Sequence, residues 1–226
     1  MQIPLALNPP RRPGFGNFLA GPNQAVVDTL KFGLEAGACY FLGGPPGYGR
    51  THLALASYAH LARAGRSVRF VPLGHPGAFR VLDEAAAEWL VLDDVDRLAG
   101  QDDAELGLFN ALNRWRADLS GVLMTGVGRR GFRLPDLNSR LAQATGLVLR
   151  PLDDSDRHQL ISMLAREREV AIGRGVADYL LQRGPRNPGE LARLIEAMTA
   201  RALAERRVLS IPLARELLGR SPTRAE

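Results

Sequence analysis

A glycine-rich run has the residue types and spacing needed to bind phosphate. Gly43 to Thr51 reads GGPPGYGRT, after an apolar stretch at 38–42 and before an apolar run at 53–64. It matches the P-loop pattern G-x-x-x-x-G-K-[ST] except that Arg50 replaces the lysine. Glycines let the backbone approach phosphate oxygens, and the N-terminus of the following helix directs N–H groups at them. The run therefore predicts a nucleotide phosphate site between a strand and a helix.

Arg50 changes what this loop is expected to do. Its guanidinium is a wide planar fork, whereas the usual lysine ammonium is a compact point charge. The fork can engage two phosphates at once, so we expect ADP to be bound and the site to hydrolyse nucleotide poorly. A compositional preference is the alternative explanation, because Lys31 is the only lysine among 29 basic residues.

Two carboxylates, those of Asp93 and Asp94, follow the apolar run at 89–92. Asp93 is expected to hold Mg²⁺ together with the hydroxyl of Thr51. Asp94 stands where the attacking water would be polarised, and it is shorter than the glutamate common in vigorous ATPases. Thr125, at the end of the next apolar strand, is expected near the γ-phosphate or that water. The alternative is that the acids merely cap a helix.

These side chains need a parallel sheet to bring them together. Continuous apolar runs predict strands at 38–42, 67–73, 88–94, 121–126 and 146–149. Helical runs at 53–64 and 102–118 alternate with them, which is typical of an α/β parallel sheet covered by helices on both faces. We expect this nucleotide-binding domain to span 15–150.

The pattern changes to helices alone after Pro151. Helices are expected at 153–169 and 173–183, and a last short one opens at Pro212. Between them, Asn187 followed by Pro188 and Glu190 is a strong helix start. A small all-helical lid domain at 151–226 is therefore predicted.

The first fourteen residues differ from the rest of the chain. An apolar peptide, 1–7, precedes a proline-rich connector, 8–14, that cannot be helical. We interpret 1–14 as a flexible tail that ends in a recognition peptide. Pairing of the peptide as an edge strand is the alternative.

Composition narrows the protein class. No apolar stretch approaches the roughly 20 residues that cross a bilayer, and the N-terminus lacks a secretory pattern. Cys39 is the only cysteine, which excludes a disulfide framework. We therefore expect a cytoplasmic protein. The net charge of +5 is dispersed, which favours an ordinary solvated surface over a nucleic-acid face.

Arg140 is set apart by its neighbours. It lies in the run LPDLNSRL at 134–141, whose Leu137 and Leu141 are expected to face inward. Arg140 would then project outward, away from the chain's own phosphate site. Taken alone, an outward arginine is most often simple surface charge.

Together these motifs resemble the DnaA-type AAA+ family, and within it the Hda group of replication regulators. The resemblance is carried by five segments: QIPLAL at 2–7, FGNF at 15–18 with Gly21 and Asn23, the P-loop with GRTHL at 49–53, LDD at 92–94 with Asn110 and Asn113, and LPDLNSRL at 134–141. The chain ends at Glu226, after the lid, so we expect no DNA-binding domain of the DnaA kind.

The resemblance implies an ADP-bound regulator. Such proteins dock on the sliding clamp and stimulate hydrolysis of ATP held by DnaA, contacting DNA only through the loaded clamp. By position, Arg140 would be the arginine finger acting in trans. The clamp-binding residues would be Gln2, Ile3, Leu5 and Leu7. The nucleotide-binding residues would be Phe15, Asn17, Phe18, Pro46, Gly47, Tyr48, Gly49, Arg50, Thr51, His52, Asp93, Asp94 and Thr125.

Several points stay open in the sequence. Gly189 stands where the family carries a lid arginine, and Arg186, Arg193 or no residue takes its role. A self-acting ATPase of the helicase-loader type is the alternative function. A nucleic-acid-binding module is disfavoured, because no aromatic stacking platform appears. Whether the chain forms a homodimer is also left open.

Overall fold

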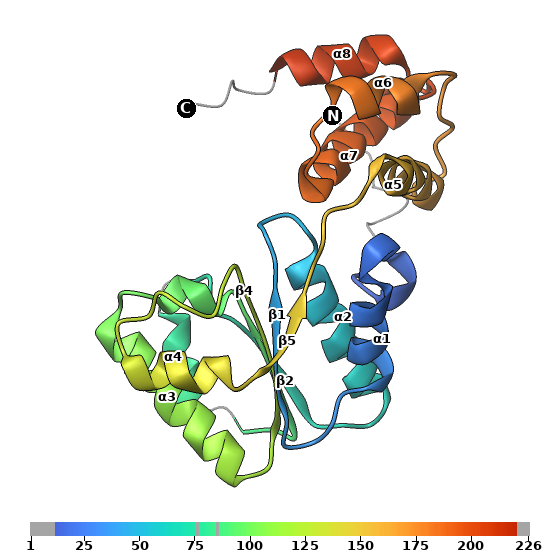
Figure 1. Ribbon diagram of the computed structural model, residues 1–226. Helices are drawn as coiled ribbons and strands as arrows, with labels where there is room; N and C mark the ends of the chain where they lie inside the picture. The colour runs from blue at the N-terminus through green and yellow to red at the C-terminus, as the bar shows by residue number, and fades with distance from the viewer. Residues whose placement is uncertain (1–11, 76, 85, 221–226) are drawn as a thin grey trace, which may run out of the picture. The chain divides into compact units, whose positions relative to one another are not determined.

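The computed structural model describes residues 12–75, 77–84 and 86–220 (Figure 1). These residues fall into two compact units, one spanning Pro13–Arg150 and the other beginning at Pro151. A bilayer-spanning helix would need about 20 apolar residues, and none of the described helices meets that requirement.

The first unit is built on one parallel sheet. Its strands are β1 (Cys39–Gly43), β2 (Val68–Pro72), β3 (Trp89–Asp93), β4 (Gly121–Gly126) and β5 (Thr145–Val148). The order across the sheet is β2-β3-β4-β1-β5, and every pairing is parallel. All five strands expected from the sequence form, each within one residue of its predicted ends. The predicted α/β fold is therefore confirmed.

Helices cover both faces of the sheet (Figure 1). One face carries α1 (Gln24–Phe32) and α2 (Arg50–Arg63), and the other carries α3 (Asp102–Ala117) and α4 (Pro135–Ala142). Four short 3₁₀ turns complete the unit: η1 (Phe15–Asn17), η2 (Gly21–Asn23), η3 (Ala78–Asp83) and η4 (Val95–Leu98). Helix α1 and turn η3 were not expected from the sequence.

Strand residues alternate between the two faces. Leu90 and Leu92 belong to the core on the α3 side, whereas Trp89 and Val91 belong to the core on the α2 side. This period of two lets a continuous apolar run serve two cores at once.

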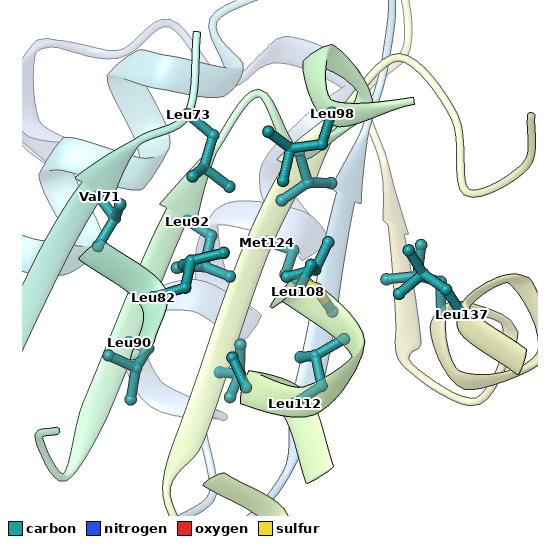
Figure 2. Close-up of a cluster of buried hydrophobic side chains, with 14 of the residues drawn as sticks. Val71, Leu73, Leu82, Leu90, Leu92, Leu98, Leu108, Leu112, Met124 and Leu137 are labelled. Carbon is teal, nitrogen blue, oxygen red and sulfur yellow. The ribbon is translucent and has the colours of Figure 1, made fainter. Parts of the chain in front are cut away.

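The core on the α3 side fixes the site-bearing strands to their helices (Figure 2). Each buried leucine contributes about 1.5–3 kcal/mol through removal of its apolar surface from water. The labelled side chains are Val71, Leu73, Leu82, Leu90, Leu92, Leu98, Leu108, Leu112, Met124 and Leu137. They come from β2, β3 and β4, from the segments that follow β2 and β3, and from helices α3 and α4. Their packing makes the carboxyl edge of the sheet rigid.

The second unit is built from helices, as predicted, with one isolated parallel bridge between Ile172 and Leu209. The helices are α5 (Asp154–Glu167), α6 (Val176–Arg183), α7 (Pro188–Ala204) and α8 (Ile211–Arg220). Asn187 caps α7 as expected, because its Oδ1 accepts from the N–H groups of Gly189 and Glu190 at 3.0 and 3.1 Å. Its core is made by Leu160, Ile161, Leu180, Leu191, Ile195, Met198 and Leu213.

Glu105 joins α3 to the start of α4. Its side chain is buried, and it accepts from the N–H of Gly100 at 2.7 Å and from the N–H of Leu134 at 2.8 Å. Burial alone would raise the pKa of Glu105, but the backbone donors of Leu134, Gly100 and Arg133 outweigh it and lower the pKa below its ordinary value. The carboxylate therefore holds the helix that carries Arg140.

We predict that Glu105→Gln destabilises the protein. The amide would present an NH₂ group to one of the two backbone donors, at a cost of about 1.5–3 kcal/mol. For a chain of this size the melting temperature should fall by roughly 3–12 °C. Glu84→Gln, at an exposed position, is the matched control and should leave the melting temperature unchanged.

The contribution of the Glu105 carboxylate to the free energy of unfolding should depend on pH. A lowered folded-state pKa means that the stabilisation is complete above the unfolded pKa of about 4.3. It is lost as pH falls through the folded-state pKa, so the gap between wild type and Glu105→Gln should narrow in acid. A gap that stays constant from pH 7 to pH 3 in denaturant titrations would contradict this account.

Candidate nucleotide-binding site

The site lies where three adjacent strands end. Leu42 on β1 pairs with Thr125 on β4, and Leu92 on β3 pairs with Met124 on β4. The P-loop leaves β1 directly after Gly43, and Asp93 is the last residue of β3. Ligands of open parallel sheets bind at this carboxyl edge.

The P-loop requires glycine where the chain turns into α2. Gly49 has φ +95° and caps the helix that begins at Arg50. A Cβ at this position would come 2.6 Å from Cε2 of Phe18. Gly49 therefore lets the loop fold tightly over the aromatic ring, while the first N–H groups of α2 remain available for phosphate.

One carboxylate joins the P-loop helix to β4. The hydroxyl of Thr51 donates to Asp93 Oδ2 at 2.8 Å, and the hydroxyl of Thr125 donates to Asp93 Oδ1 at 2.6 Å. Thr125 Oγ1 in turn accepts from the N–H of Asp94 at 3.0 Å. Thr51, Asp93 and Thr125 thus form a connected polar network at the floor of the site.

Arg50 lies among the acids that follow β3. Its Nη2 donates to Asp94 Oδ1 at 3.2 Å, and its Nη1 is 3.9 Å from Asp96 Oδ1. The guanidinium side chain is 10% exposed, and Nη1 is buried without a hydrogen-bond partner among the described residues. A buried donor of this kind fits an anionic ligand such as a phosphate.

Asp94 is held in an unusual environment. Its backbone is left-handed, with φ 57°, at the start of η4. Burial raises the pKa of Asp94 above its ordinary value, and the charge of Asp93 raises it further, against the lowering effect of Arg50. One oxygen of this carboxyl group, Oδ1, is engaged by Arg50.

Several of the other expected nucleotide-binding residues lie along α2. His52 Nε2 lies 3.0 Å from the carbonyl oxygen of Gly14, and its ring centre is 5.5 Å from that of Phe18. Asn17 Oδ1 accepts from the N–H of Gly14 at 2.8 Å. Phe15 lies further along the helix, 5.7 Å from the ring of His60. Tyr48 packs against the core on the α2 side of the sheet.

The residues present could supply part of the ligand shell of a Mg²⁺ ion, with nucleotide phosphates and waters supplying the rest. Thr51 and Asp93 are the two expected ligands, and their oxygens are adjacent. Among the described residues no group of three or more His, Cys, Asp or Glu side chains could hold a metal by itself. Mg²⁺ in nucleotide sites typically takes one or two protein ligands and completes its shell with phosphates and waters.

Arg140 is separated from this site. It lies on α4 between the buried Leu137 and Leu141, and its Nη2 donates to Asn113 Oδ1 on α3 at 2.6 Å. Burial raises the pKa of Cys39, which begins β1, and the Arg140 charge opposes that rise. Helix α4 leads into β5, whose first residue, Thr145, pairs with Tyr40 at the amino end of β1, whereas the P-loop follows the carboxyl end of β1. The Asn113 contact was not indicated by the sequence.

Other expected residues lie elsewhere. Gln2, Ile3, Leu5 and Leu7 fall outside the described residues. In the lid, the N–H of Gly189 is used by the helix cap, and Arg186 and Arg193 are exposed. A hydrogen bond from Arg157 lowers the pKa of Asp154, and the Arg186 charge adds to this effect.

Solved structures with the same fold include two DnaA proteins. Domain III of DnaA from Thermotoga maritima aligns with a TM-score of 0.77 at 18% identity, covering 91% of this chain and 95% of that one. AMPPCP-bound DnaA from Aquifex aeolicus aligns with a TM-score of 0.71 at 21% identity, covering 88% and 68%. The Holliday-junction motor RuvB from Thermotoga maritima reaches 0.61 at 18% identity, covering 80% and 61%. The body therefore has the AAA+ fold of DnaA.

The lid decides which DnaA relatives this chain resembles. Residues 154–218 match the family model "Hda, lid domain". The chain therefore resembles Hda in its lid domain and DnaA in its fold. The resemblance expected from the sequence motifs is thereby confirmed, with a lid of the Hda type following the DnaA-like body.

Asp96 is the site residue that sequence reasoning missed in this Hda-like chain. Its Oδ1 is buried near Arg50, at the end of β4, where a Cβ on Gly126 would lie only 2.8 Å away. The signal was present as a third acid in the run Asp93-Asp94-Val95-Asp96, which the usual two-carboxylate pattern does not include.

We predict that Thr125→Val destabilises the polar network. The variant keeps the side-chain shape but leaves Asp93 Oδ1 and the N–H of Asp94 without their partner, at a cost of about 2–3 kcal/mol. Thr125→Ser keeps the hydroxyl and should lose only about 1 kcal/mol from the missing methyl. Urea titrations measure both. Equal losses in the two variants would show that packing, not the hydroxyl, matters.

Proposed function

We propose that this chain is a nucleotide-binding regulator that stimulates hydrolysis of ATP bound to DnaA. The observation that carries the proposal is the Arg50–Asp94 pair at the P-loop. The position for the phosphate-gripping lysine and the position for the water-polarising acid engage each other, in a DnaA-like body with an Hda-type lid. Such a site favours nucleotide binding over turnover.

The nucleotide proposed for this site is ADP. The P-loop glycines, the N-terminus of α2 and the buried Nη1 of Arg50 all offer contacts to phosphate. DnaA from Aquifex aeolicus is known bound to AMPPCP, which supports a nucleotide in the same fold here. Where Mg²⁺ accompanies the nucleotide, Thr51 and Asp93 would hold it, and the ion would neutralise phosphate charge.

The proposed partners are DnaA and the sliding clamp. Residues 15–150 would be the nucleotide-binding domain and 151–226 the lid, while 1–14 would dock on the clamp through Gln2, Ile3, Leu5 and Leu7. An extended peptide with one amide and spaced aliphatic side chains suits a groove, and the proline-rich connector lets the body swing. The chain would act in the cytoplasm.

Arg140 is the proposed arginine finger. Its position on α4 near the amino end of β1 keeps it from the chain's own P-loop, so a nucleotide on another subunit is its natural target. To act, the guanidinium would exchange its Asn113 contact for a phosphate oxygen. An arginine delivered to the developing charge accelerates hydrolysis by about 10³–10⁵-fold.

Arg140→Ala should abolish stimulation of DnaA-bound ATP hydrolysis on a loaded clamp. Clamp affinity and ADP affinity should not change, because neither the proposed clamp peptide at 2–7 nor the P-loop includes this residue. Arg140→Lys should restore little, since a point charge cannot make the forked contact. Single-turnover hydrolysis of labelled ATP on DnaA measures the effect.

Asn113→Ala is the matched control for Arg140. It removes the same hydrogen bond but keeps the guanidinium, so stimulation should persist. If Asn113→Ala and Arg140→Ala lose stimulation equally, Arg140 acts by holding α4 to α3 and not as a finger. Steady ATP turnover by the purified chain alone would instead favour the helicase-loader alternative.

Gln2→Ala combined with Leu5→Ala should abolish clamp binding. Interface anchors of this kind contribute several kcal/mol together. Surface plasmon resonance on immobilised clamp measures the loss, and Asn8→Ala in the connector serves as the control. A lowered melting temperature with unchanged clamp affinity would mean that the peptide pairs within its own fold.

A further inference from the structure

Three carboxylates leave β3 together, and they are not equally engaged. Both oxygens of Asp93 accept hydroxyl hydrogen bonds, and Asp94 Oδ1 accepts from Arg50. Asp96 Oδ1 is buried and has no hydrogen-bond partner among the described residues. The guanidinium atom Nη1 of Arg50 is 3.9 Å from it.

Negative charge is in excess at this edge of the sheet. The guanidinium of Arg50 is the only cation within ion-pair distance of Asp94 or Asp96 among the described residues. The exposed Arg97 contributes a weaker, more distant charge. One buried arginine thus faces the carboxylates of Asp93, Asp94 and Asp96, and a further anion placed beside them would be repelled.

The position of Asp96 is fixed by β4. Gly126 follows Thr125 directly, and its missing side chain is the space that Asp96 Oδ1 fills. Asp94 thus contacts Thr125 and Asp96 lies beside Gly126, with side chains 28% and 24% exposed. In P-loop proteins the acids after this strand face the terminal phosphate, not the base or ribose.

We propose that Asp96 determines nucleotide specificity, by making this site select a nucleoside diphosphate over a triphosphate. The P-loop and Arg50 hold two phosphates, and the Asp96 carboxylate opposes a third phosphate at the sheet edge. This inference rests on the proposed nucleotide-binding function and names the residue that sets the ligand. Asp96 also draws Arg50 Nη1 toward β4, so it is a positioning residue for the guanidinium as well.

Calorimetric titration of the full chain with ADP and with AMPPCP tests the proposal. Wild type should bind ADP more tightly than AMPPCP. Asp96→Asn should reduce the ratio Kd(AMPPCP)/Kd(ADP) at least about tenfold, mainly through tighter AMPPCP binding. Asparagine keeps the size of the side chain and removes only its charge. Asp103→Asn, an exposed site on α3, removes one charge elsewhere and should leave the ratio unchanged.

Asp96→Glu guards against a folding effect. It keeps the charge, so the preference for ADP should persist even if its melting temperature falls as far as that of Asp96→Asn. Equal affinities of wild type for the two nucleotides, or an unchanged ratio in Asp96→Asn, overturns the inference. A ratio that drops in both Asp96 variants also overturns it, because shape and not charge would then be responsible.

The failure of this inference is distinguishable from failure of the proposed function. Preference for ADP that depends on Asp96, without stimulation of DnaA by ADP-loaded protein, supports the specificity role and removes the regulatory one. If the protein stimulates DnaA but the ratio of its AMPPCP and ADP dissociation constants does not depend on Asp96, the regulatory role is supported and the specificity role is removed. Absence of binding to either nucleotide overturns both.

Discussion

The hydrogen bonds of the Asp93 carboxylate are the constraint on which the rest of the site depends. Thr51 reaches it from the P-loop helix and Thr125 reaches it from β4, so one side chain on β3 joins three elements. Asp93 is almost fully buried, and an ionised carboxylate at such a depth requires both donors. Any ligand that approaches these three residues therefore meets a preformed surface, with little reorganisation needed on binding.

The contacts of the Arg50 guanidinium complement those of Asp93. Each oxygen of Asp93 accepts from a hydroxyl group, whereas the Arg50 guanidinium donates to Asp94 and lies near Asp96. Its planar fork can face two acids at once, which a lysine ammonium at the end of a longer flexible stem does less well. The arginine at this position therefore faces both acids that follow Asp93, including the third acid of the run, Asp96.

The sequence predicted what local pattern determines and missed what tertiary packing determines. Apolar runs placed all five strands, and Asn187 with Pro188 placed the start of α7. Asp96 was missed because its role depends on Gly126, thirty positions away, leaving room for its carboxylate. The Arg140–Asn113 contact likewise joins two helices whose crossing no periodicity encodes.

The support of α4, which carries the proposed finger Arg140, depends on a buried acid on α3. Glu105 on α3 accepts from the N–H of Leu134 just before α4, and Asn113 on the same helix accepts from Arg140 near its end. Helix α4 is thus fixed to α3 at both ends, while Leu137 and Leu141 fill the core between them. Breaking the Asn113 contact frees only the guanidinium, because Glu105 and the two leucines keep the helix in place. A proposed finger on such a support can exchange partners without any movement of the fold that presents it.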